Sequence, residues 1–119
     1  MKAKEAVVSK LRDLVHASLL DDKAEDVVSI DLSGKTSFAD YMVIANGHSS
    51  RQVGAMAEHL KDRIKDAGFG LVQIEGKANC DWVLVDAGDV IIHLFRPEVR
   101  DFYNLEKIWS PTIPAEMTN

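Results

Sequence analysis

The segment at residues 79–95, NCDWVLVDAGDVIIHLF, constrains the fold most, because it predicts a β-hairpin built largely from apolar residues. Residues 82–86 and 90–95 each form the apolar run of a strand, and Ala87-Gly88 lies between them. The glycine can supply the positive φ of a tight turn. A strand that is apolar on both faces must be covered on both, so we expect other elements to pack on this hairpin.

The rest of the chain predicts those elements. An amphipathic helix begins near the N-terminus, and a last helix starts at Arg96-Pro97. Between them, a second, amphipathic helix opens with a capping-box pattern, Ser49 followed by Gln52, and stops at Gly68. Its predicted buried stripe is Val53, Met56, Ala57, Leu60 and Ile64. Further strands are predicted at residues 27–32, which alternate in polarity, at 41–45, which read as a central strand, and at 71–75, which read as an edge strand.

The predicted order is therefore α-β-β-α-β-β-β-α, and it defines the fold class as α/β (α+β). We expect a mixed sheet of about five strands with helices packed on it, and one right-handed crossover where a strand, a helix and a strand follow one another. Residues 1–110 form a single predicted domain, and residues 111–119, with Pro111 and Pro114, read as a flexible tail.

Charge and composition limit the partners. The net charge of −5 and the pI of about 5.3 disfavour binding to nucleic-acid phosphates, which depends on Lys and Arg. They favour a basic protein as the partner. The single Cys80 excludes an internal disulfide and fits a reducing cytosol. Because no apolar run approaches the length of a membrane span, and the N-terminus does not resemble a signal peptide, we expect a cytoplasmic protein without membrane contact.

Catalytic patterns are missing from the sequence. Metal-dependent nucleotidyl transfer needs carboxylates converging from one strand face, typically as Asp-x-Asp, and the chain has none. Asp86 and Asp89 lie three residues apart across the hairpin turn, where the commoner role is to bind local backbone. The four histidines show no ligand spacing, and Cys80 has no partner for a metal. We therefore predict no catalytic residue, no metal and no cofactor.

Trp82 allows two interpretations. It opens a strand beside Asp81, while Asp89 and His93 share the parity of one face of the next strand. An exposed indole among polar groups is typical of a binding hot spot. Alternatively, Trp82 packs on the last helix, against Phe102 or Trp109. Periodicity favours neither interpretation.

At these residues the sequence resembles the family of ribosomal silencing factors, also called RsfS, iojap or YbeB. The resemblance rests on four blocks in order: SIDLSGKTSFADYMVIANGHSSRQV, IEG at 74–76, DWVLVDAGDVIIHLF and RPEVRDFYNLEKIW. It covers about residues 5–110. It implies a nucleotidyltransferase-like fold without that superfamily's catalytic carboxylates.

The resemblance also implies a function. Such a protein represses translation under nutrient limitation by binding the large ribosomal subunit through its fourteenth protein, which blocks association with the small subunit, and it often forms a homodimer when free. The implied contact residues are Asp81, Trp82, Asp89 and His93, with Tyr103 and Glu106 from the last helix. The alternative is a nucleotide-handling enzyme on the same fold that uses Asp86 and Asp89 to hold a metal.

Overall fold

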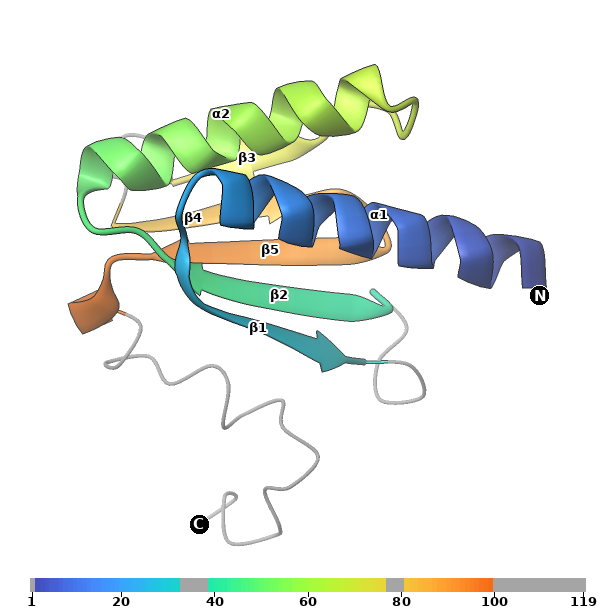
Figure 1. Ribbon diagram of the computed structural model, residues 1–119, viewed down its shortest axis with the longest axis horizontal. Helices are drawn as coiled ribbons and strands as arrows, with labels where there is room; N and C mark the ends of the chain where they lie inside the picture. Colours follow the sequence, from blue (N-terminus) through green and yellow to red (C-terminus); the bar gives the residue numbers. More distant parts are fainter. Residues whose placement is uncertain (1, 33–38, 77–80, 100–119) are drawn as a thin grey trace, which may run out of the picture.

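A single mixed sheet with two long helices on one of its faces makes up the structure, a computed structural model that describes residues 2–32, 39–76 and 81–99 (Figure 1). The helices are α1 (Lys2–Asp21) and α2 (Ser50–Asp66). The strands are β1 (Glu25–Asp31), β2 (Tyr41–Asn46), β3 (Gln73–Glu75), β4 (Trp82–Asp86) and β5 (Val90–Phe95). No helix in these described ranges is long and apolar enough to cross a membrane.

The strand order is β1-β2-β5-β4-β3, with β2 and β5 parallel and the other neighbours antiparallel. The predicted mixed sheet of five strands is thus confirmed, with β2 inside the sheet and β3 at its edge. The hairpin strands also have the predicted bounds. The parallel partner of β2 is β5, so the chain passes from β2 through α2 to the far edge and returns inward through β4.

The larger core lies between the helices and the sheet. It takes alternate residues from each central strand, and the apolar stripe of α2 packs on them. All five predicted stripe residues are buried: Val53, Met56, Ala57, Leu60 and Ile64. The prediction of an amphipathic second helix is confirmed.

A second apolar cluster covers the opposite face of the sheet. Its buried members come from β1, β2, β5 and the ends of the β1–β2 connection: Ile30, Leu32, Ala39, Met42, Ile44 and Phe95. Trp82 and Ile91 pack against this cluster from the same face. Val99, in the helical turn that begins at residue 97, does so too. The remainder of the predicted last helix lies outside the described residues, as does the predicted tail.

The start of α2 differs from the predicted capping box in one contact. The Ser49 hydroxyl accepts a hydrogen bond from the Gln52 backbone N–H at 3.1 Å, as predicted. The Gln52 side chain, however, accepts from the His48 N–H at 2.6 Å, one residue before the cap, and its amide donates to the Asp22 carbonyl at 3.1 Å. Gln52 therefore also helps to fix the end of α1.

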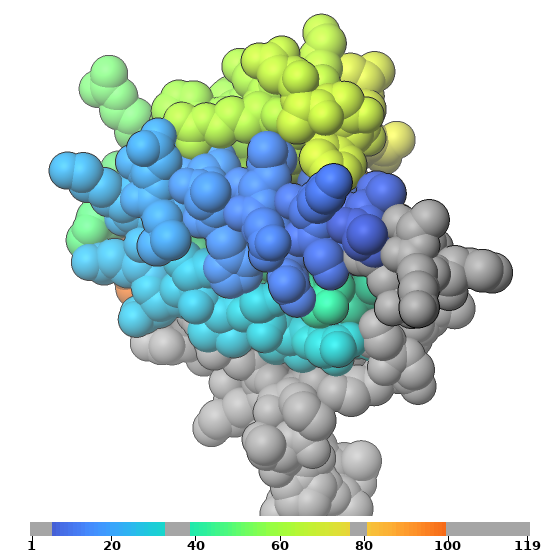
Figure 2. All heavy atoms as spheres, turned by 45° about the vertical axis from the view of Figure 1, so that its right-hand side comes forward, coloured from blue at the N-terminus to red at the C-terminus, as the bar shows by residue number. Residues whose placement is uncertain are grey.

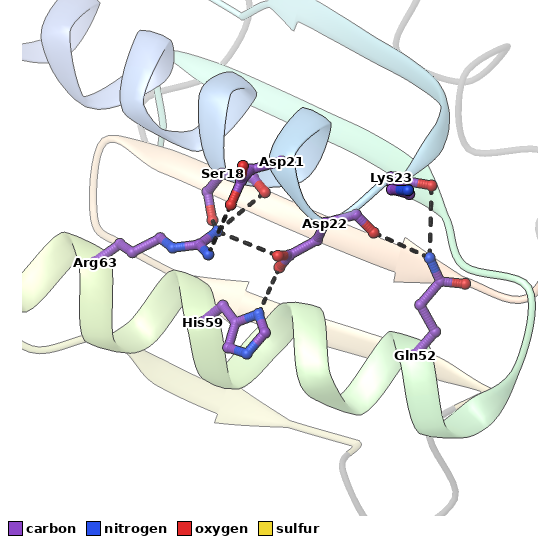
Figure 3. A network of polar contacts seen from close by, with 7 residues as sticks. All are labelled: Ser18, Asp21, Asp22, Lys23, Gln52, His59 and Arg63. Carbon is purple, nitrogen blue, oxygen red and sulfur yellow. Dashed lines mark hydrogen bonds and ion pairs between the residues drawn. The ribbon is translucent and has the colours of Figure 1, made fainter.

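A polar network joins the C-terminal end of α1 to α2 (Figure 3). Arg63 donates to the carbonyl and the hydroxyl of Ser18, at 3.1 and 2.7 Å, and pairs with Asp21 and Asp22. His59 lies 2.7 Å from the Asp22 carboxylate. Because Ser18 belongs to the last turn of α1, Arg63 supplies donors to a helix end that lacks enough internal ones.

Replacing Arg63 with methionine should lower the free energy of unfolding by about 2 kcal/mol, because the stem volume is kept while the network loses its charged donors. Urea denaturation followed by circular dichroism measures the change. The control is Arg51→Met on the exposed side of the same helix, where we expect about 0.5 kcal/mol or less. Equal losses in the two variants would contradict the role assigned to the network.

Candidate protein-binding surface

Three rings form an aromatic group on the sheet face opposite the helices. Trp82 starts β4 directly across from Phe95 at the end of β5, and His93 lies two residues before Phe95 on the same face. The Trp82 ring centroid is 5.1 Å from that of Phe95 and 5.8 Å from that of His93. His93 stacks on Phe95 with an interplanar angle of 12°. Trp82 is half-buried, so one part of the indole packs and another part reaches solvent.

A hydrogen bond sets the protonation state within this group. The Trp82 indole N–H donates to Nδ1 of His93 at 2.9 Å. Nδ1 must then be unprotonated, so the neutral imidazole carries its proton on Nε2. Burial lowers the pKa of His93 to about 4. At pH 7 His93 is therefore an uncharged, packed acceptor that orients Trp82.

Charged groups lie beside the rings. The Asp81 carboxylate accepts from the Arg96 guanidinium at 3.1 Å, and the Asp81 carbonyl accepts from the Arg96 N–H at 3.1 Å. Arg96 also donates to Glu98 at 2.7 Å. The hydrogen bond to Asp81, followed by the charge of Glu98, raises the pKa of Arg96. Asp81 is thus tied to the end of β5 and forms a polar rim next to Trp82.

The predicted contact residues do not all meet. Asp81, Trp82 and His93 lie together, but Asp89 precedes the other end of β5, about 20 Å from the Trp82 end at strand rise. The Asp89 carbonyl accepts the N–H groups of Asp40 and Tyr41, at 2.8 and 3.1 Å, which ties the hairpin to the start of β2. Tyr103 and Glu106 lie outside the described residues, as do Phe102, Trp109 and Cys80.

The alternative role of the turn aspartates as metal ligands is not supported by the contacts of Asp86. Its carboxylate accepts the N–H of Gly88 at 2.9 Å, and Gly88 has a φ of +86°. This is the predicted turn role, and it is confirmed for Asp86. No group of three or more His, Cys, Asp or Glu side chains within the described part of the chain is arranged to hold a metal ion.

Phe95 and Arg96 support this surface, although no sequence pattern marked them as contact residues: Phe95 is fully buried beneath the indole, and Arg96 pairs with Asp81. Phe95 shares the parity of His93 along the strand, and Arg96 follows it directly. The parity was a usable signal for Phe95. Nothing in the sequence indicated that Arg96 pairs with Asp81, because that contact depends on the register between β4 and β5.

An aromatic group with a charged rim on one face of a small α/β domain is typical of a protein-binding surface. The sequence profile described as "Ribosomal silencing factor during starvation" matches residues 4–119. The chain therefore belongs to this family, and the resemblance seen in the sequence blocks is confirmed. Membership assigns the protein to the ribosome-associated regulators of translation.

Relatives and a solved structure agree. The ribosomal silencing factor RsfS of Zymomonas mobilis is 63% identical over 99 residues, which cover 83% of this chain and 74% of that protein. The mouse protein named "Mitochondrial assembly of ribosomal large subunit protein 1" is 37% identical over 101 residues, covering 82% of this chain and 44% of that protein. A crystal structure from Chromobacterium violaceum has a TM-score of 0.84 at 39% identity and covers 90% of this chain and 89% of that one.

Proposed function

We propose that this protein silences ribosomes by binding the large subunit through its fourteenth ribosomal protein and blocking association with the small subunit. Two findings support the proposal: the family description, and the large subunit in the name of the mouse relative. In this proposal the protein acts in the cytoplasm under nutrient limitation, without catalysis, and forms a homodimer when free.

The observation that carries the proposal is the half-buried Trp82, held on its inner side by His93 and Phe95 and bordered by Asp81. A rigidly oriented indole among polar groups is the usual anatomy of a hot spot. The net charge of −5 complements the positive charge of a basic ribosomal protein. The same negative charge gives this chain little attraction to the phosphates of ribosomal RNA. Occupying the subunit interface would then repress translation sterically.

Sedimentation of purified ribosomal subunits tests the proposal. We expect the protein to lower the fraction of joined ribosomes in proportion to its concentration, and to cosediment with the isolated large subunit. The small subunit alone is the control and should not carry the protein. Unchanged joining at saturating protein would refute the proposed mechanism.

Replacing Trp82 with alanine should weaken binding to the large subunit about 30-fold, or about 2 kcal/mol, because a hot-spot indole is lost. Trp82→Phe keeps a ring against Phe95 but loses the donor to His93, so it should fold and bind with intermediate affinity. Leu71→Ala removes an 80% exposed apolar side chain elsewhere and is the control. If Trp82→Ala binds as tightly as Leu71→Ala, Trp82 is not the anchor.

A further inference from the structure

An open groove of about 550 Å³ lies on the helix side of the sheet, away from the Trp82 surface. It runs between α1 and β1, the blue and cyan surfaces that face the viewer in Figure 2. Its lining residues are Arg12, Asp13, His16, Ser29, Asp31 and Tyr41. Both residues from β1 are polar, although Ser29 stands opposite the buried Val43 of β2, which fits a solvent-filled groove.

The strand beside this groove ends the sheet in the described part of the chain. The Leu32 N–H donates to the Asp40 carbonyl at 2.8 Å, and Ile30 is the register partner of Met42. Hydrogen-bonded positions alternate along an antiparallel ladder, so Leu32, Ile30 and Val28, the last opposite Ile44, bond to β2. Ser29 lies between Val28 and Ile30 and directs its N–H and C=O groups outward. Ser29 therefore presents backbone groups to the edge and its side chain to the groove.

Charge limits what can pair with this edge. β1 contains Glu25, Asp26 and Asp31 and no basic residue, and Asp13 adds a carboxylate from α1. Arg12, the cation of the groove, lies over the Tyr41 ring at 4.8 Å and pairs with Asp13 at 3.3 Å. Burial, followed by the charge of Arg12, lowers the pKa of His16, which disfavours a second positive charge in the groove.

The same acids oppose pairing with a second copy. Two β1 strands placed edge to edge would bring like charges together, which destabilises a strand pair. A bulge between Glu25 and Val28, with Asp26 at a φ of +51°, further restricts regular pairing to residues 28–32. Charged and bulged edges are common devices against self-association. A basic strand meets no such repulsion, so the edge disfavours pairing with a second copy of β1 and favours a strand of opposite charge.

We propose that this edge and groove bind an extended basic segment of another protein, which adds as a strand outside β1 and places alternate side chains in the groove. Main-chain hydrogen bonds would give the affinity, and the acids would select the charge. The site is separate from the Trp82 surface, so the protein could hold this segment while docked through the opposite face of the sheet.

Fluorescence anisotropy with a labelled Lys-Val-Lys-Val-Lys-Val peptide tests the proposal. We expect saturable binding, a loss of at least tenfold when glutamate replaces lysine, and a loss of at least tenfold for Lys-Val-Lys-Pro-Lys-Val. The proline peptide keeps its charge but lacks a backbone donor. Equal binding of the proline and valine peptides would show attraction by charge alone and overturn strand addition, and so would no binding of either.

Protein variants locate the site. Ser29→Pro removes only an outward N–H, which an edge strand tolerates. It should weaken binding of the peptide at least tenfold and leave the circular dichroism spectrum unchanged. Asp13→Lys should weaken binding of the peptide about tenfold. Asp62→Lys makes an equal charge change at an exposed position of α2, and its affinity for the peptide should stay within twofold of that of the unaltered protein. Equal losses in the two lysine variants would overturn the location, even if Ser29→Pro fails to fold.

Two further readouts separate this proposal from others. Asp13→Lys should still block subunit joining, so a failure at the groove is distinct from a failure of ribosome silencing. Sedimentation of the free protein should be the same for Asp13→Lys and the unaltered chain. A change of oligomeric state in that variant would identify a second copy as the occupant and overturn the proposal.

Discussion

Replacing Gly76 with alanine should lower the free energy of unfolding by about 3 kcal/mol or more, because two separate costs coincide at this position. Gly76 has a φ of +89°, where a side chain is strained. A Cβ would also lie 2.3 Å from the carbonyl oxygen of Trp82, which is backbone and cannot rotate away. The strand that carries Trp82 would have to move.

Gly70→Ala is the matched control for this prediction. Gly70 has a φ of +95°, and a Cβ there would meet nothing within 4 Å. It carries the strain without the clash, so we expect about 1–2 kcal/mol. Urea denaturation gives the loss in free energy of unfolding for each variant, and the difference between the two losses is the cost of the clash with Trp82. Equal destabilisation would show that Gly76 is needed only for its backbone angle.

The Gly76 contact also bears on function. Gly76 directly follows β3, and its close approach fixes the backbone at the start of β4, where the aromatic surface begins. A shift of that backbone should loosen the Trp82 bond to His93. We therefore expect Gly76→Ala to weaken binding to the large subunit at temperatures where it is still folded, whereas Gly70→Ala should bind normally.

Local patterns predicted the elements well because they depend on short-range causes. The hairpin bounds, the buried stripe of α2 and the turn role of Asp86 follow from side-chain periodicity and from one glycine with positive φ. The shared parity of His93 and Phe95 along β5 is likewise a local feature of the sequence. These features require no knowledge of which strands pair.

Contacts that depend on strand register could not be predicted. The bond from Trp82 to His93 and the pairing of Asp81 with Arg96 both require that β4 and β5 align with Trp82 opposite Phe95. The same register places Asp89 far from Trp82, although Asp89 shares the parity of His93. The network of Arg63 likewise depends on how two helices distant in sequence cross, which no local pattern specifies.

The stability of the protein should fall by about 3 kcal/mol between pH 6.5 and pH 4 because of His93 alone. Burial lowers its pKa to about 4 in the folded chain, against 6.5 when unfolded. Between these values the unfolded chain binds more protons, so the contribution is fully present above pH 6.5 and is lost as the pH falls toward 4. Protonation of Nδ1 would also remove the acceptor of Trp82.

His93→Asn separates this contribution from that of the carboxylates. The asparagine oxygen can stand near the position of Nδ1 and accept the indole N–H, but it does not titrate in this range. Denaturation at several pH values should show a pH dependence smaller by about 3 kcal/mol in the variant. The carboxylates titrate in both proteins and cancel in the difference.

A pH profile for His93→Asn that matches that of the unaltered protein would mean that the folded chain protonates His93 readily. In that case the imidazole would be charged in mildly acidic solution, and Trp82 would lose its fixed orientation there. The prediction thus tests whether a neutral histidine holds the proposed anchor in place.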